Sequence, residues 1–149
     1  MINVANTKSG VYPCYENQFS IGAVNAETLS SIADCVSFGV SFEDNVEEWT
    51  PYSSEGWKRR LKTGKGVTIS VTAKRNVGDT GNDFVAGLAF KNGRESECDF
   101  QWNFPDSTIV KFGSAVINLK SLGGGDSTNV APLEFDIMSN GKPTITEPA

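Results

Sequence analysis

Acidic residues are the most numerous groups in this sequence that could do chemistry. They come in runs rather than as isolated pairs, whereas a hydrolase with two catalytic carboxylates needs two of them facing each other across a cleft. The carboxylates in question are Glu43, Asp44, Glu47, Glu48, Glu95, Glu97 and Asp99. Histidine, the most common general base and metal ligand, is absent. We therefore expect no catalytic residue, no cofactor and no metal site; a sandwich hydrolase built on these carboxylates stays an alternative.

Two glycine-rich segments raise the question of a phosphate-binding loop. Such a loop follows a strand and directly precedes a helix, whose first N–H groups bind the phosphate. After GGGDSTN (residues 123–129), however, the segment PLEFDIM alternates like a strand, and no Gly-Lys-Ser/Thr ending is present. We interpret 123–129 as a long connection between strands that contacts another copy, with Asp126 and Asn129 at a subunit edge. TGKG (63–66) precedes a strand and is interpreted as a turn.

The one basic cluster, WKRRLKTGK (57–65), combines lysine and arginine with a tryptophan. Such a cluster can stack on and pair with nucleic acid, but the net charge of −5 favours contact with the acidic EDNVEE segment (43–48) of a neighbouring copy. Aromatic residues and arginine are enriched at interfaces. The candidate contact residues are Glu47, Trp49, Tyr52, Trp57, Arg59 and Arg60. A monomeric carbohydrate-binding module, with the three aromatics as a stacking platform, stays an alternative.

The length and the cysteine content of the chain limit the classes of protein to which it can belong. The chain has 149 residues, near the most common size of a single domain. Its three cysteines, Cys14, Cys35 and Cys98, are widely spaced and form no Cys-x-x-Cys pair, so we expect reduced, buried thiols. No apolar run approaches the ~18 residues of a membrane span, and the first ten residues lack the pattern of a signal peptide. We expect a protein kept in the cytoplasm, with no membrane partner.

Apolar alternation predicts the elements that position these residues. Strands are expected over 32–42, 67–74, 97–104, 108–119 and 132–138. A helix is expected to begin at Asp79 or Thr80, within DTGND, and to stop at Gly93. Residues 1 to about 20 have no lasting period and are expected to form an arm, and 43–66 a long loop. The order of elements predicts one domain, an antiparallel β-sandwich or barrel with one flanking α-helix.

The first predicted strand illustrates how its side chains are expected to divide between two faces. Val36, Phe38, Val40 and Phe42 fall on one face, and small residues fall on the other. In VTISVTAK (67–74) the apolar positions likewise alternate with serine and threonine. These patterns predict a sheet with one core face and one polar face.

Taken in order, these elements resemble a known family. The order is an alternating strand, a charged Trp-containing segment, VTISVTAKRN, a helix that starts after GD and ends in NG, two strands, and the tail GGGDSTNVAPLEFDIMSNGKPTI. It is similar to that of the major tail tube proteins of long-tailed phages and phage-tail-like bacteriocins, whose fold is related to the tube protein of type VI secretion systems. The resemblance covers roughly residues 30 to 147.

The resemblance implies a structural protein of the virion tail, assembled in the cytoplasm of the host bacterium. Members form hexameric rings that stack into a hollow tube, a conduit through which DNA passes without specific binding. The expected partners are other copies of the chain, a tape measure protein and tail completion proteins. The segment 43–66 is expected to reach the neighbouring ring, and the N-terminal arm to make further contacts. A flexible tail and the inner tube of a contractile particle both stay open.

Overall fold

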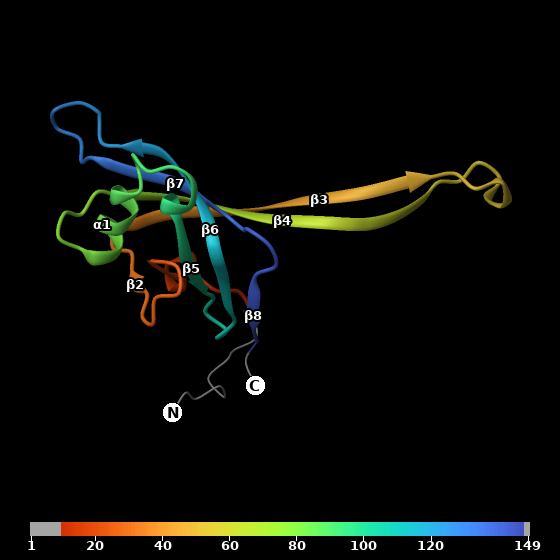
Figure 1. Ribbon diagram of the computed structural model, residues 1–149, viewed down its shortest axis with the longest axis horizontal. Helices are drawn as coiled ribbons and strands as arrows, with labels where there is room; N and C mark the ends of the chain where they lie inside the picture. The colour runs from red at the N-terminus through yellow and green to blue at the C-terminus, as the bar shows by residue number, and fades with distance from the viewer. Residues whose placement is uncertain (1–9, 148–149) are drawn as a thin grey trace.

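Alternating apolar residues give the chain a sheet of eight antiparallel strands within residues 10–147, the part that this computed structural model describes (Figure 1). The strands are β1 (Gln18–Gly22), β2 (Ser30–Ser31), β3 (Cys35–Trp49), β4 (Arg59–Lys74), β5 (Glu97–Asn103), β6 (Ile109–Leu122), β7 (Pro132–Met138) and β8 (Thr144–Thr146). The helical elements are α1 (Thr80–Gly87) and the short 3₁₀ helices η2 (Cys14–Glu16), η3 (Tyr52–Ser54) and η4 (Gly93–Ser96). No helix among the described residues has the length and apolar character needed to cross a membrane.

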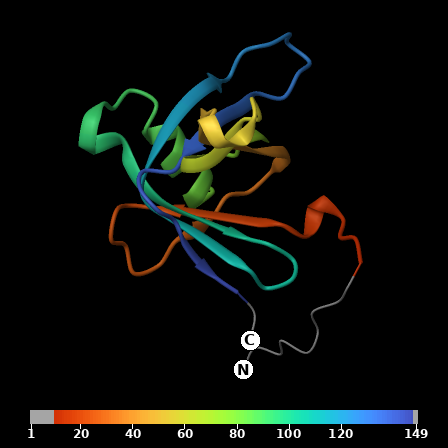
Figure 2. The same ribbon diagram turned by 90° about the vertical axis from the view of Figure 1, so that its right-hand side faces the viewer.

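The sheet is one continuous ladder that folds over on itself. Its order is β2-β1-β5-β6-β7-β4-β3, with β8 paired to the first residues of β6. The first half of β6 lies beside β5 and its second half beside β7, so β6 belongs to both layers (Figure 2). Phe19 of β1 meets Phe38 of β3 with ring centroids 4.9 Å apart, which closes the two ends of the sheet around a shared core. The predicted β-sandwich or barrel with one helix is confirmed.

The core consists of the inward-facing residues of these strands and of α1. It holds four buried phenylalanines, together with aliphatic residues from β4 and β7. The buried apolar residues are Phe19, Ile21, Ile32, Ile69, Val71, Ala73, Val85, Leu88, Cys98, Phe100, Phe112, Ala115, Ile117, Leu133, Phe135 and Ile137. A core of this size is the main stabilising contribution in a chain without disulfides among its described residues.

Several predicted boundaries are confirmed and others are wrong. The strand 132–138 lies where it was expected, and Asp79 caps α1 by accepting a hydrogen bond from the Asn82 N–H at 3.0 Å. The helix ends at Gly87 rather than Gly93, because the residues after it form a turn and then η4. Residues 18–20 of the expected N-terminal arm belong to β1, whereas residues 1–9 lie outside the described part of the chain.

The predicted apolar face of β3 is only partly buried. Phe38 and Val40 pack against the core, but Val36 is 63% exposed and Phe42 is 66% exposed. Val36 sits at a β-bulge between Cys35 and Ser37, which turns its side chain outward. Phe42 pairs with Val67, one position beyond the last residue of β4 that pairs with β7. From Phe42 onward, β3 therefore extends beyond the part of the sheet that contains β7, and its side chains no longer pack against the core.

Residues 43–66 form a paired hairpin, not the irregular loop that the sequence suggested. We call this hairpin the arm and its end, residues 50–58, the tip. β3 and β4 stay in register from Glu43↔Gly66 to Trp49↔Arg59, interrupted by one bulge between Asn45 and Val46. The TGKG segment lies inside β4 beside that bulge and is not a turn. Figure 1 shows the arm projecting well beyond the body of the molecule.

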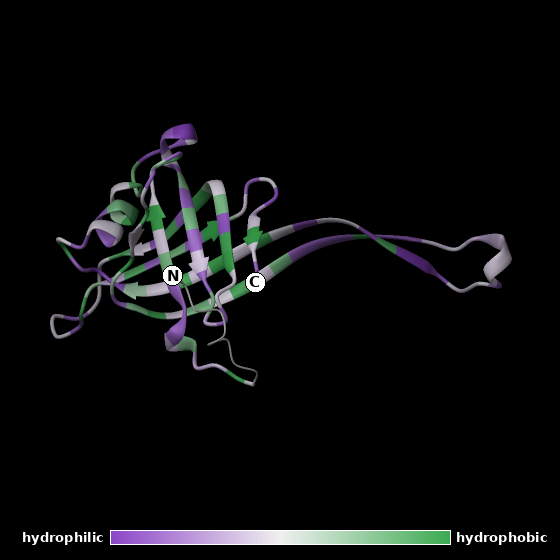
Figure 3. Cartoon of the chain, turned by 90° about the horizontal axis from the view of Figure 1, so that it is seen from below, coloured by the Kyte–Doolittle hydropathy of each residue, from purple (hydrophilic) through white to green (hydrophobic). Residues whose placement is uncertain are grey.

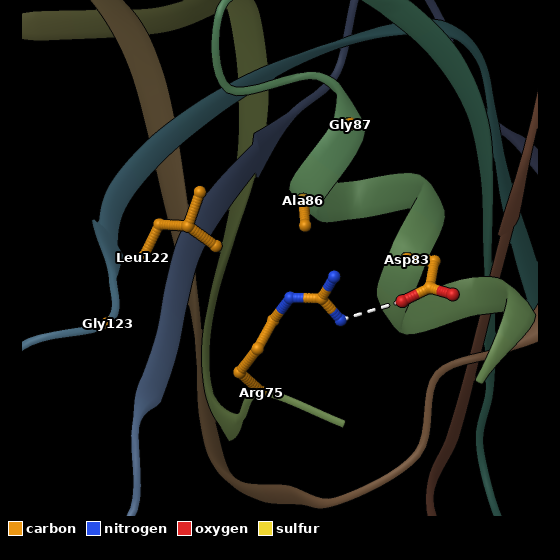
Figure 4. Close-up of a pocket in the computed structure, with 6 residues that line it drawn as sticks. All are labelled: Arg75, Asp83, Ala86, Gly87, Leu122 and Gly123. Atoms are coloured by element: carbon orange, nitrogen blue, oxygen red, sulfur yellow. Dashed lines mark hydrogen bonds and ion pairs between the residues drawn. The ribbon is translucent and has the colours of Figure 1, made fainter. Parts of the chain in front are cut away.

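A buried polar cluster ties α1 to the body. Asn82 is fully buried and donates to the carbonyl oxygens of Ala33 and Lys74, at 3.3 and 2.8 Å. The Arg75 guanidinium donates to Asn82 at 2.9 Å. It also donates to Asp83 at 2.8 Å (Figure 4). Its hydrogen bond to Asp83 is the main reason that the pKa of this carboxyl lies below its usual value of 3.8. The helix is thus held at a fixed place beside β4 and the β2–β3 connection.

Candidate assembly surfaces

The predicted contact residues of the basic and acidic segments all lie at the outer end of the arm. Glu47 and Trp49 end β3, Tyr52 lies in η3, Trp57 follows it, and Arg59 and Arg60 begin β4. Tyr52 is fully exposed, Trp57 is 79% exposed, and the described residues leave both rings uncovered. The structure therefore brings these residues together at the outer end of the arm; whether they contact another copy stays a prediction.

Five of the ten charged side chains of the arm form ion pairs with one another. Glu48 lies 3.4 Å from Lys58 and 3.3 Å from Arg60, and Asp44 lies 3.2 Å from Lys62. All these side chains are substantially exposed, so each pair contributes about 1 kcal/mol at most. Their effect is to fix the cross-strand register of a two-stranded hairpin that has no third strand beside it.

The two faces of the arm differ in character. Cross-strand register places the ion pairs on one face. The opposite face carries Trp49 and Leu61, with the Arg59 guanidinium 5.7 Å from the centre of the Trp49 ring. Leu61 is 59% exposed. This second face also carries Glu47, opposite Leu61. Because the first face already forms ion pairs internally, the exposed Trp49 and Leu61 side chains and the tip are the parts of the arm that gain most from a partner.

Asp126 and Asn129 lie in the loop between β6 and β7, at the end of the body away from the arm (Figure 1). The Asn129 N–H donates to the Asp126 carbonyl oxygen at 2.9 Å, which closes a turn. Gly123, Gly124 and Gly125 all have positive φ, from 98° to 122°, so the three-glycine run is required by the backbone of this connection. The interpretation of this run as a connection between two strands is confirmed.

The half of the sheet formed by β6, β7, β4 and β3 has two unpaired edges. Among the described strands, β3 pairs with β4 alone, along its whole length. On the other side of this half-sheet, β5 pairs with β6 as far as Val116, and no described strand lies beside residues 117–122 on the side opposite β7. Unpaired edges of this length are templates for another strand.

The outer face of the same half-sheet is polar and lacks a covering layer of secondary structure among the described residues. Its side chains come from every second position of the four strands. They include Ser37, Ser41, Thr68, Ser70, Thr72, Asn118, Glu134 and Asp136. The Lys120 ammonium lies 3.5 Å from the Asp136 carboxylate. The expectation of a sheet with one core face and one polar face is confirmed.

A groove of about 890 Å³ lies where the arm leaves the body. One wall is the base of the arm, Phe42 and residues 62–67, and the other is formed by the chain after β7, including Lys142, Pro143 and Ile145. A smaller hollow of about 440 Å³ lies between α1 and the end of β6, with Arg75 and Asp83 at its centre (Figure 4). Sequence reasoning missed the larger groove, because its walls are far apart in the chain.

The three cysteines are free thiols, but the expectation that they are buried is wrong for Cys14. Cys14 is exposed, Cys35 is half-buried and Cys98 is buried. Burial is the main cause that raises the pKa of Cys35 to about 11 and that of Cys98 to about 12, and neighbouring carboxylates add to the effect. The two buried thiols are therefore protonated at neutral pH and react slowly.

Solved structures with a similar fold come from the tails of virus-like particles. No protein-family profile matches the chain, and no curated protein matches it either. A chain of the tail of an empty gene transfer agent particle, solved by helical refinement with C6 symmetry, matches with a TM-score of 0.73 and 19% identity, over 91% of this chain and 99% of that one.

Two further matches come from a contractile injection system and from the cap of a prophage-derived tube. A chain of the sheath–tube complex of the PVC extracellular contractile injection system matches with a TM-score of 0.65 and 13% identity, over 99% of both chains. A chain of the tube-terminating cap of the anti-feeding prophage matches with a TM-score of 0.57 and 13% identity, again over 99% of both chains. The chain therefore has a phage tail tube-like fold, as the order of its sequence elements indicated.

Proposed function

We propose that this chain is a non-enzymatic structural subunit that forms hexameric rings, and that these rings stack into the hollow tube of a phage tail or a phage-tail-like particle. The observation that carries the proposal is the half-sheet β6-β7-β4-β3, which has two unpaired edges and one uncovered polar face. The fold shared with tail components of a gene transfer agent and of contractile injection systems supports it.

The strand directions allow a ring to close through these edges. Every pairing in the half-sheet is antiparallel, so β3 runs opposite to β6. When copies are related by rotation about a tube axis, β3 of one copy meets residues 117–122 of the next, and the two strands are again antiparallel. The hydrogen bonds that each edge lacks are then supplied by the neighbouring copy, and the half-sheets join into one barrel.

The polar face of the half-sheet then lines the lumen. It carries the carboxylates of Glu43, Glu134 and Asp136 and two lysines: Lys120, which lies beside Asp136, and the exposed Lys74 at the end of β4. Serine and threonine hydroxyls, which add no charge, are the most numerous of the remaining groups on this face. A wall of this composition has a negative potential, which repels phosphate and lets DNA pass without binding. During assembly the same lumen would hold a tape measure protein.

The arm is proposed to join successive rings. Its exposed tip, with Tyr52 and Trp57, projects beyond the body and has no cover in a single copy. The loop that contains Asp126 and Asn129 lies at the opposite end of the body, where it would face the adjacent ring from the other side (Figure 1). Completion proteins would then bind the unoccupied surface of the last ring.

Negative-stain electron microscopy of the purified protein, over a range of concentrations, tests this proposal. We expect rings or hollow tubes of uniform diameter at high concentration, with stain entering the lumen. A chain that remains monomeric at every concentration and salt condition would overturn the proposal. Irregular aggregates without a lumen would also contradict it, since closed rings are its central requirement.

A further inference from the structure

We infer that the groove at the base of the arm is the docking site for the arm tip of a second copy of this chain. This inference rests on the proposed function, in which the arm joins successive rings. The groove lies between the start of the arm and the chain after β7, and its volume of about 890 Å³ is large enough for several side chains.

The floor of the groove is apolar and uncovered. Phe42 is 66% exposed and Ile145 is 58% exposed, and Val67 and Pro143 lie beside them. Phe42 continues the apolar face of β3 beyond the end of β7, and its large apolar side chain is therefore left exposed to solvent. Figure 3 shows apolar segments of β3 and β4 where the arm leaves the body, and mostly hydrophilic ones farther out. An aromatic or aliphatic partner would remove this surface from water.

The rim of the groove is positively charged. Lys62, Lys65 and Lys142 line it, and none of its lining residues is acidic. Lys62 is paired with Asp44 at 3.2 Å. Among the residues that the structure describes, Lys65 and Lys142 form no ion pair. The groove therefore fits an apolar segment that carries a carboxylate.

The tip of the arm has this composition. Tyr52 and Trp57 are exposed aromatics, and Glu55 lies between them in the sequence with no ion-pair partner among the described residues. Lys58, the other charged residue of the tip, is already paired with Glu48 at 3.4 Å.

If the tip docks in the groove, the two aromatic rings cover the apolar floor and Glu55 lies near the ammonium groups of Lys65 and Lys142. The contact then buries the exposed apolar surface and forms new ion pairs. The ion-paired face of the arm needs no such partner.

Geometry makes this a contact between different copies. The groove and the tip lie at opposite ends of the same arm, so the tip cannot reach its own groove (Figure 1). A contact between two different patches of the same chain repeats in one direction and produces an open series of copies. The strand from Phe42 to Trp49 spans roughly 23 Å at about 3.3 Å per residue. Successive rings are therefore expected to be displaced by about 25–35 Å along the arm.

Site-directed cross-linking tests the docking. In a Cys14→Ser background, Ser53→Cys places a thiol on the tip and Lys142→Cys places one on the rim of the groove; both positions are exposed. Assembled protein carrying both substitutions is treated with a short bismaleimide. We expect a ladder of covalent multimers on a denaturing gel, and at least tenfold less product from either single variant.

The matched control pairs Ser53→Cys with Ser127→Cys, an exposed serine in the loop between β6 and β7. If tubes form but the ladder appears with Ser127 and not with Lys142, the tip docks elsewhere and the groove assignment is wrong, while the proposed function stands. If no tubes form under any condition, the proposed function fails and the docking fails with it.

Exchanging the charges of Glu55 and Lys142 tests the same contact independently. Glu55→Lys and Lys142→Glu should each raise the concentration needed for tube formation about fivefold, because each places like charges together at the rim. The double variant should recover most of this loss. If the concentration that the double variant needs for tube formation is raised by the product of the two single-variant factors, Glu55 does not meet this rim and the inference is overturned.

Discussion

Removing the two tip aromatics should abolish tubes without unfolding the subunit. Tyr52 is fully exposed and Trp57 is 79% exposed, so Tyr52→Ala with Trp57→Ala removes almost no buried surface from a single copy. The melting temperature of the monomer should therefore change by less than about 2 °C. The effect is expected only where a second copy covers these rings.

The magnitude follows from the area available. Each ring that loses about 100 Å² of exposed apolar surface contributes about 2.5 kcal/mol at about 25 cal/mol per Å², and ordering of the side chain reduces this to about 2 kcal/mol. Two rings then contribute about 4 kcal/mol per contact, which corresponds to roughly a thousandfold rise in the concentration needed for assembly. Tyr52→Phe with Trp57→Phe keeps most of this area and should assemble within about tenfold of the unchanged chain.

Sedimentation of assembled protein over a concentration series, checked by negative-stain electron microscopy, measures this effect. Circular dichroism of the unassembled fraction confirms that the variant is folded. Normal tubes from the double alanine variant at unchanged concentration would refute the assignment of the tip to contact between rings. Loss of tubes together with a large drop in melting temperature would refute the view that these residues stabilise nothing within one copy.

Three further predictions concern the body of the subunit. Gly81→Ala should destabilise the fold by about 1–3 kcal/mol in chemical denaturation, because a Cβ would overlap the Ser31 carbonyl oxygen, whereas Gly87→Ala meets no atom and should be neutral or mildly stabilising. Asp83 has a lowered pKa, so its stabilising contribution is present above the usual carboxyl value of 3.8 and is lost as the pH falls below it; the difference in melting temperature between the unchanged chain and Asp83→Asn should narrow toward about pH 3. A thiol reagent at mildly alkaline pH should label Cys14 rapidly and the two buried cysteines slowly, and mass spectrometry that finds all three labelled equally would contradict their burial.

The strands of the body were predictable because each buries one face. Val67 to Ala73 and Leu133 to Ile137 show the two-residue period that a core on one side imposes. The cap of α1 was predictable for a similar local reason, since Asp79 needs only the N–H of Asn82 to act. Strands and helix caps that depend on residues close together in the chain could thus be predicted from the sequence.

The arm was not predictable in the same way. Beyond Phe42 there is no core, so the pattern of the hairpin is set by charges across the two strands, and the bulge at Asn45 breaks its period. β1 escaped prediction because its five residues lie in a polar lead-in and depend on β5 for pairing. The unpaired edge of β6 could not be read from sequence at all, since it depends on where β5 begins. Whether the predicted contact residues meet another copy depends on a partner that a single chain does not contain.

The most direct measurement of the central proposal is a cryo-electron microscopy reconstruction of tubes assembled from the purified chain. The account predicts a wall in which β3 of one copy pairs with residues 117–122 of the next, with Glu134 and Asp136 facing the lumen. A wall in which these two edges stay apart, or in which the polar face of this half-sheet points outward, would contradict it.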